Sequence, residues 1–218
     1  MSQLWGNAEP SIVEPHGGEI PLMLPVRLDA YVNTRLGSFA WGSDYPSGPA
    51  WIGGIPFEIS MFGGGAGAIS LGGRDVTVPL PPGPHDAVFL IMNAAWGIAG
   101  AQLGEIVFSG PRGSLRHPLV QGLNVRDHRV DALNNTAARA CASATYPDGS
   151  RFDVYRYDLS PLDGRVELLQ IAIDSVLPAQ GLPFLAGVTL CGRGEAQRRR
   201  TPPGPRSRIA RRILAGSV

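Results

Sequence analysis

Residues 85–128 read HDAVFLIMNAAWGIAGAQLGEIVFSGPRGSLRHPLVQGLNVRDH, and this stretch decides the fold. It contains three short apolar runs, at residues 87–92, 103–109 and 115–120. The segment Gly110-Pro111-Arg112-Gly113 separates the second run from the third and is a tight-turn signal. Apolar runs punctuated at intervals of about ten residues are typical of an antiparallel β-sandwich or barrel. We therefore expect an all-β protein, built as an antiparallel β-sandwich.

The rest of the chain adds further strand signals, for a total of eight or nine expected strands. The additional runs are residues 20–28, 55–59, 75–80, 151–159, 166–173 and 184–190. Pro21 and Pro25 restrict the first of these runs to an edge strand. We interpret residues 62–73 (FGGGAGAISLGG) as a flexible loop, and residues 129–144 as a short helix or an irregular loop with a strand. Residues 38–54 are expected to be rich in loops.

Three segments make up the expected domain organisation. Residues 1–19 form an irregular lead, residues 20–192 the sandwich domain, and residues 193–218 a basic tail that we expect to be disordered. The tail carries eight Arg against one Glu, whereas the preceding residues carry 11 Arg against 17 acidic residues. We interpret the tail as a solubilising end. Contact of the tail with nucleic acid, an anionic membrane or an acidic partner is the less favoured alternative.

The composition excludes several kinds of chemistry. All 19 basic residues are Arg, so a Schiff base, a lysine general base and a P-loop are excluded. Cys141 and Cys191 are the only cysteines, and we expect buried free thiols rather than a disulfide. We expect neither a secretory signal nor a transmembrane segment, and hence a cytoplasmic protein.

The strand pattern resembles the galactose-binding-domain-like jelly rolls, which occur as carbohydrate-binding or accessory modules. The resemblance covers residues 29–190 and is carried by Gly54–Phe57, Val76–Pro79, Leu90–Trp96 and Pro118–Asp127, with the late strands behind them. It implies a jelly-roll sandwich and a non-catalytic module that binds carbohydrate. It also implies a structural calcium ion as an option, for which Asp29, Asn33 and Asp174 are conceivable ligands. No other cofactor is expected.

Two sets of residues are candidates for a ligand site. Sugar binding needs a flat aromatic face together with a few polar groups that bond hydroxyls. The aromatic candidates are Trp41, Tyr45 and Trp51 in one loop-rich segment and Trp96 at a strand end; packing in the core or a loop is the favoured interpretation for each, and a ligand platform is the alternative. The polar candidates are Asn124, Arg126, Asp127 and His128, the densest polar cluster in the domain, which could equally pin its own loop.

Two other functions remain open from the sequence. One is a structural jelly-roll subunit that oligomerises, with the Arg-rich tail on an acidic partner. The other is an enzyme of unknown reaction with an acid or His site on a loop, for which Asp127 with Asp131, or Asp153 with Asp158, would be the glycosidase-type acid pair. The sequence favours a non-catalytic protein, because it has no nucleophile motif and no metal-binding His spacing.

Overall fold

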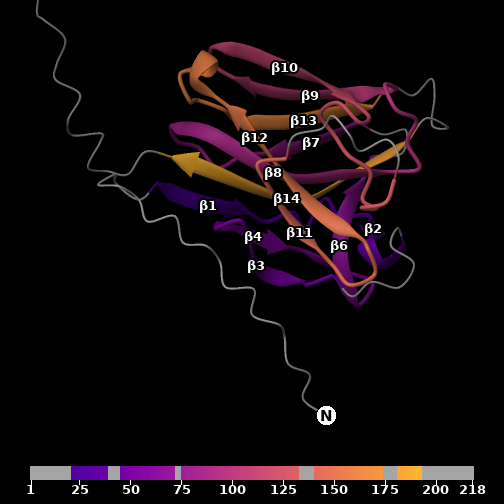
Figure 1. Ribbon diagram of the computed structural model, residues 1–218. Coiled ribbons are helices and arrows are strands. Elements are labelled where there is room, and N and C mark those ends of the chain that lie inside the picture. The colour runs from indigo at the N-terminus through magenta and orange to yellow at the C-terminus, as the bar shows by residue number, and fades with distance from the viewer. Residues whose placement is uncertain (1–20, 39–44, 72–74, 133–139, 174–180, 193–218) are drawn as a thin grey trace, which may run out of the picture.

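The computed structural model describes residues 21–38, 45–71, 75–132, 140–173 and 181–192 (Figure 1). Within these residues the chain is all-β, with fourteen strands and two short 3₁₀ turns. The strands are β1 (Leu22–Val26), β2 (Thr34–Arg35), β3 (Gly48–Ile52), β4 (Ile55–Ile59), β5 (Met61–Phe62), β6 (Gly65–Ser70), β7 (Val76–Pro79), β8 (His85–Ala95), β9 (Gln102–Gly110), β10 (Gly113–Val120), β11 (Ala142–Thr145), β12 (Arg151–Asp158), β13 (Leu168–Ile173) and β14 (Leu182–Gly192). The lead, the Arg-rich tail, Trp41 and Asp174 lie outside the described residues.

The strands form an antiparallel β-sandwich with an extra layer (Figure 1). One face of the sandwich is a four-stranded sheet in the order β10-β9-β13-β7. The other is a larger sheet in the order β11-β12-β8-β14-β6-β2, which β1 and β5 extend. The two-stranded β3–β4 hairpin packs on the outer face of this larger sheet, so the larger sheet is the middle layer of three.

The central strand β8 shows why the sequence contains a continuous apolar run. Val88, Leu90 and Met92 belong to the core between the two sheets, whereas Phe89 and Ile91 belong to the core under the β3–β4 hairpin. Successive side chains of a strand point to opposite faces, so a strand buried on both faces is apolar along most of its length. The continuous apolar run therefore indicates a strand in a middle layer, which is buried on both faces, and not a sandwich strand with one face in solvent.

Most of the longer expected strands are confirmed. β8, β9 and β10 cover the three runs of residues 85–128, and Gly110 pairs with Gly113 across the two-residue turn Pro111-Arg112. The expected count of eight or nine was too low because it omitted short strands. The loop expected at 62–73 was wrong in part, because Met61–Phe62 and Gly65–Ser70 pair as a hairpin and Ala68 and Ile69 are fully buried. The described part of 129–144 contains β11 and no helix.

Two Gly-Gly turns close the short hairpins that the sequence reading missed. Gly53-Gly54 and Gly63-Gly64 have the same backbone angles, with φ of +58° and +78° at the two positions. Positive φ at both central residues is the type I′ turn, whose twist matches that of paired strands. A Gly-Gly pair between apolar residues was therefore a hairpin signal.

The edge strand β1 brings the two ends of the described domain together. β1 pairs antiparallel with β14 along its whole length, and Leu22 lies opposite Gly192. Pro25 lies in this strand, as expected for an edge position. The first and last described strands therefore start and finish side by side (Figure 1).

The two cysteines are free, as expected, but they are not buried: Cys141 is exposed and Cys191 is half-buried. Cys141 immediately precedes β11, and three strand spacings separate β11 from β14. At about 4.8 Å per spacing, this distance of about 14 Å is too great for a disulfide. In the described part of the chain, no helix is long and apolar enough to cross a membrane.

The two Gly-Gly turns provide a matched test of the three-layer packing. An alanine Cβ at Gly53 would overlap the Cβ of Ala142 on β11, whereas one at Gly63 would meet nothing within 4 Å. We expect Gly63→Ala to lower the free energy of unfolding by about 1–2 kcal/mol through its positive φ alone. Gly53→Ala should cost about 1–3 kcal/mol more, because the hairpin must shift away from the middle layer.

Denaturant unfolding of both variants measures the difference, and Ala142→Gly in the Gly53→Ala background should recover the excess. Equal losses in the two single variants would contradict close packing of the β3–β4 hairpin on β11.

Candidate functional site

The candidate site lies where β8 and β12 separate. The two strands pair from Ala87 opposite Asp158 as far as Ile91 opposite Val154. Beyond this point, residues 126–128 occupy the space between them. The N–H of Ala94 donates to the carbonyl of Arg126 (2.9 Å), and the N–H of His128 donates to the carbonyl of Ala94 (2.8 Å). Residues 126–128 are therefore held as a short inserted strand beside the end of β8. We call the place where β8 and β12 separate the fork, and residues 126–128 the fork segment.

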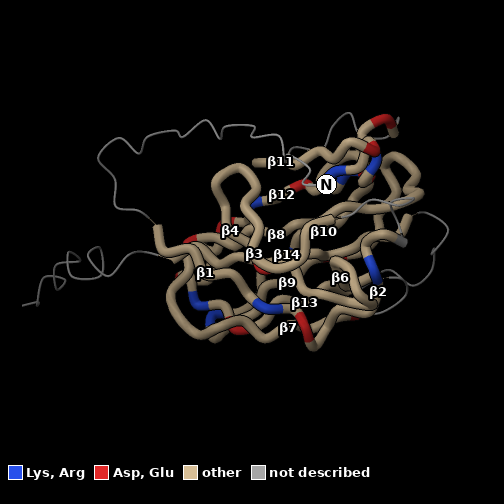
Figure 2. The backbone as a smooth tube through the Cα atoms, turned by 90° about the horizontal axis from the view of Figure 1, so that it is seen from below, with Lys and Arg blue, Asp and Glu red and all other residues tan. Residues whose placement is uncertain are grey.

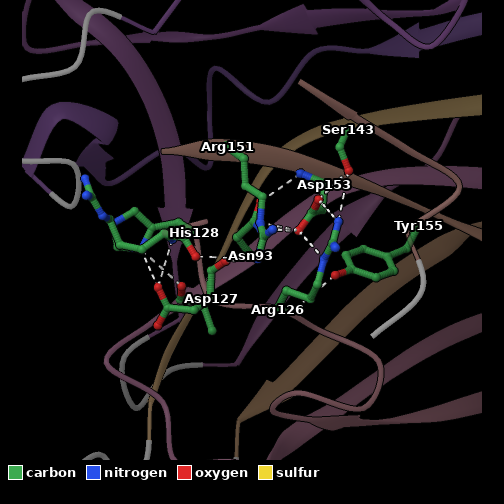
Figure 3. A network of polar contacts seen from close by, with 10 residues as sticks. Asn93, Arg126, Asp127, His128, Ser143, Arg151, Asp153 and Tyr155 are labelled. Carbon is green, nitrogen blue, oxygen red and sulfur yellow. Dashed lines mark hydrogen bonds and ion pairs between the residues drawn. The ribbon is translucent and has the colours of Figure 1, made fainter. Parts of the chain in front are cut away.

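Asp153 fills the apex of this fork and is fully buried. Asn93 supplies the pairing that the separated backbones lack: its Nδ2 donates to Asp153 Oδ2 (2.8 Å), and its Oδ1 accepts from the Asp153 N–H (2.9 Å). The Ser143 hydroxyl donates to Asp153 Oδ1 (2.6 Å). Figure 3 shows these side chains converging on one carboxylate.

Two guanidinium groups neutralise this buried carboxylate. Arg126 donates through Nε to Oδ2 (3.0 Å) and through Nη2 to Oδ1, a bidentate pair. Arg151 Nε forms an ion pair with Oδ2 at 3.2 Å, and its Nη2 donates to the carbonyl of Asp127 (3.1 Å). Burial lowers the pKa of Arg126, but its bonds to Asp153 outweigh this and raise it overall; at Arg151 burial prevails and lowers the pKa. Both remain charged, because arginine is protonated throughout the ordinary pH range.

Asp127 and His128 also have local partners. Asp127 Oδ1 accepts from the Arg129 N–H (2.9 Å). His128 is buried, and its Nδ1 lies 3.3 Å from both Asp127 Oδ1 and the carbonyl oxygen of Ala94. Both neighbours are acceptors, so Nδ1 carries the hydrogen. The ring packs edge-on against Phe184 of β14 at a centroid distance of 6.3 Å, so His128 is held in the core by contacts with β8 and β14.

Asn124 stabilises the turn that leads into this segment. Its Oδ1 accepts from the Val120 N–H (2.7 Å), and its Nδ2 donates to the carbonyl of Pro118. The same turn is joined to the turn after β8: the Gln121 N–H donates to Ala101 (2.9 Å), and the Gly100 N–H donates to Gln121 (2.9 Å). Residues 96–101 and 121–125 therefore form one connected end of the sandwich.

Trp96 is the candidate aromatic that this end exposes. The core position favoured from the sequence is wrong for this residue, because Trp96 is 61% exposed, although residues 87–95 of β8 before it are buried. Its φ is +54°, a left-handed conformation that a bulky residue rarely adopts. Ile98 and Leu123, on the two joined turns, are each more than half exposed. We refer to the exposed side chains of Trp96, Ile98 and Leu123 as the Trp96 surface.

Sequence reasoning missed Ile98 and Leu123 as surface residues. Each is an apolar residue next to glycine, in the segments GIAG (97–100) and GLN (122–124). An apolar side chain within a short glycine-bounded turn has little backbone around it to cover it. An apolar residue next to glycine in a short turn was therefore the available signal of surface exposure, but this signal is weaker than the side-chain periodicity of a strand.

The other aromatic candidates lie elsewhere. Tyr45 is buried, stacks on Phe152 (4.5 Å between centroids) and meets Tyr146 edge-on (4.9 Å). Trp51 is 71% exposed on β3, opposite Pro56, on the outer hairpin layer. The structure therefore places Trp96 with the Asn124–His128 segment and places Tyr45 and Trp51 with the β3–β4 hairpin. Trp41 lies outside the described residues.

The acid pairs considered for catalysis have other partners. Asp153 is enclosed by the two arginines, whereas Asp158 accepts from the Ser160 N–H (3.1 Å). Asp131 is exposed and pairs with Arg129 at 3.4 Å. Among the described residues, no group of three His, Cys, Asp or Glu could hold a metal ion. The side-chain amide of Asn33, a calcium candidate, is bonded to the backbone of Ser70: its Nδ2 donates to the Ser70 carbonyl (3.1 Å), and its Oδ1 accepts from the Ser70 N–H (2.8 Å).

Charges elsewhere on the described domain are interspersed. Figure 2 shows basic and acidic positions mixed along the chain, without one large region of either sign. Several exposed arginines are paired locally, such as Arg27 with Asp29 at 2.6 Å and Arg116 with Glu105 at 2.8 Å. The Trp96 surface is therefore distinguished by exposed apolar side chains and not by charge.

No family model matches the chain, and no curated protein matches it in sequence.

Removing the buried carboxylate should destabilise the fold strongly. We expect Asp153→Asn to lower the free energy of unfolding by about 3–5 kcal/mol, because Arg126 and Arg151 lose their shared counter-charge while remaining in place. Chemical denaturation followed by intrinsic fluorescence measures this loss. Asp158→Asn on the same strand is the control; an exposed asparagine still accepts from Ser160, so little change is expected. Similar stabilities for the two variants would contradict the role assigned to Asp153.

Proposed function

We propose that the chain is a non-catalytic carbohydrate-binding module of the galactose-binding-like sandwich type, and that its ligand surface is the Trp96 surface. The observation that carries the proposal is the exposure of Trp96 in a left-handed backbone conformation at the end of a buried strand. Backbone strain of this kind costs free energy and persists where the surrounding structure holds it, most often at functional sites.

The chemistry of the surface suits a sugar. An exposed indole offers a flat apolar face to the C–H groups of a pyranose ring, and polar groups beside it bond the hydroxyls. Ile98 and Leu123, on the two joined turns, add exposed apolar side chains at the same end. The buried Asp153 network adds rigidity nearby, because it binds Arg126, three residues after Leu123.

The partners of the nearby acids support binding rather than catalysis. A glycosidase needs two carboxyl groups free to exchange protons beside the substrate. At this end, Asp153 is enclosed by cationic and amide partners, and Asp127 accepts from the backbone of Arg129. The two free cysteines are what a reducing compartment favours, and they support a cytoplasmic location.

Loss of the indole should remove binding while leaving the turn intact. Asparagine tolerates positive φ better than other side chains, so Trp96→Asn keeps the backbone conformation and deletes the ring. We expect this variant to bind at least about tenfold more weakly, since truncating a central aromatic of an interface costs more than about 1.4 kcal/mol. The measurement is affinity electrophoresis and calorimetry of the full chain with β-glucan, galactan, xylan, mannan, polygalacturonate and alginate.

Two further variants locate the site. Met61→Ala removes a large exposed side chain from β5 and should leave binding unchanged. Trp51→Ala tests the second exposed indole, on the hairpin layer. Binding lost in Trp51→Ala and retained in Trp96→Asn would move the site to β3, and no binding of the wild-type chain to any of the six polysaccharides would refute the proposed function.

A further inference from the structure

We propose that Gln121 is the polar recognition residue of the Trp96 surface, and that its side-chain amide bonds hydroxyl groups of a neutral sugar when the turn over it moves aside. This inference rests on the proposed function and adds the ligand class and the residue that selects it.

The side-chain amide of Gln121 is buried without a partner. The residue is 1% exposed, and neither its Nε2 nor its Oε1 has a hydrogen-bond partner within the described residues. Both backbone polar groups of Gln121, in contrast, are hydrogen-bonded: its N–H donates to the carbonyl of Ala101, and its carbonyl accepts from the N–H of Gly100. The position is therefore fixed, while the amide itself is left with two N–H donors and an acceptor oxygen.

The amide lies directly beneath the turn that follows Trp96. A Cβ at Gly97 would overlap the Cδ and Oε1 atoms of Gln121, so the Gly97 backbone lies close against the amide. Residues 98–100 beyond it are exposed. A small displacement of this turn would bring the amide to the surface, beside the turn that begins at Trp96.

The burial of this amide has a physical cost that binding would recover. A buried polar group without a partner loses its bonds to water and gains none in return, and native proteins contain few such groups. A leucine or methionine at position 121 would avoid the loss in the free protein. A glutamine at this position, under the turn that follows an exposed and strained tryptophan, is explained if its partner is a ligand.

The character of the amide sets the ligand class. One amide can donate to one hydroxyl and accept from its neighbour, which matches a pair of adjacent sugar hydroxyls. It carries no charge to balance a carboxylate, and the other members of the Trp96 surface are apolar. A uronic acid would therefore lose hydration of its carboxylate without compensation. The surface should prefer neutral polysaccharides to polygalacturonate and alginate.

The test compares Gln121→Met with the wild-type full chain. Methionine matches glutamine in length and shape but removes both hydrogen-bonding functions. With whichever of β-glucan, galactan, xylan and mannan the wild type binds most tightly, we expect Gln121→Met to bind about fivefold to tenfold more weakly. Its melting temperature should stay equal or rise, because an unpaired buried amide is replaced by an apolar group. The Gln121 side-chain N–H₂ signals, identified by their absence from the variant's NMR spectrum, should shift when the polysaccharide is added.

Each result has a distinct meaning. If the wild type binds none of the polysaccharides, the proposed function fails and this inference fails with it. If the wild type binds, Trp96→Asn does not, and Gln121→Met binds as tightly as the wild type, only the role of Gln121 is overturned. A clear fall in the melting temperature of Gln121→Met would also overturn it, since the amide would then be satisfied within the folded protein. Stronger binding of polygalacturonate or alginate than of every neutral polymer would contradict the ligand class.

Discussion

The buried carboxylate of Asp153 is the constraint on which this end of the molecule depends. A fully buried charge is tolerated only when paired and hydrogen-bonded, and here Arg126, Arg151, Asn93 and Ser143 all converge on it. These partners come from the fork segment, from β8, from β11 and from β12 itself. The ion pairs therefore do more than compensate one charge. They fix the place where two paired strands separate and a third segment enters between them, and the turns that carry the Trp96 surface adjoin that place.

The second constraint is the burial of the larger sheet on both faces. The four-stranded sheet covers one face, and the β3–β4 hairpin covers part of the other. Where this sheet is covered on both faces it has no solvated side, so polar groups there must find partners in the protein. Asn93 and Asp153 do so through each other, because the Asn93 side chain substitutes for the backbone pairing that ends at Ile91 and Val154. The polar network and the apolar run in β8 are thus two consequences of the same burial.

The sequence was most informative where side-chain periodicity is strong. Residues 87–92 predicted a strand correctly, and the Gly110–Gly113 turn predicted the β9–β10 hairpin. The short hairpins were missed because strands of two to six residues carry too few side chains for a period, although the Gly-Gly turns signalled them. At the candidate site, Arg126 and Asp127 were recognised as a polar cluster, but their long-range partners were not. Nothing in the sequence places Asp153, 26 residues beyond Asp127, opposite Arg126, because strand pairing across a fork depends on the whole topology.

The pairing of Leu22 with Gly192 has a mechanical consequence. β1 and β14 are antiparallel and meet at these residues. A force that pulls the two ends apart would therefore act across the strands, and it would break the hydrogen bonds between them one after another. Strands loaded in shear share the force among all their bonds, whereas strands opened in this way do not. The domain would therefore yield at low tension, with β1 peeling away first and exposing Val26 and the edge of β14. A module held at both ends within a longer assembly would extend there under load, while the Asp153 network and the Trp96 surface stayed intact.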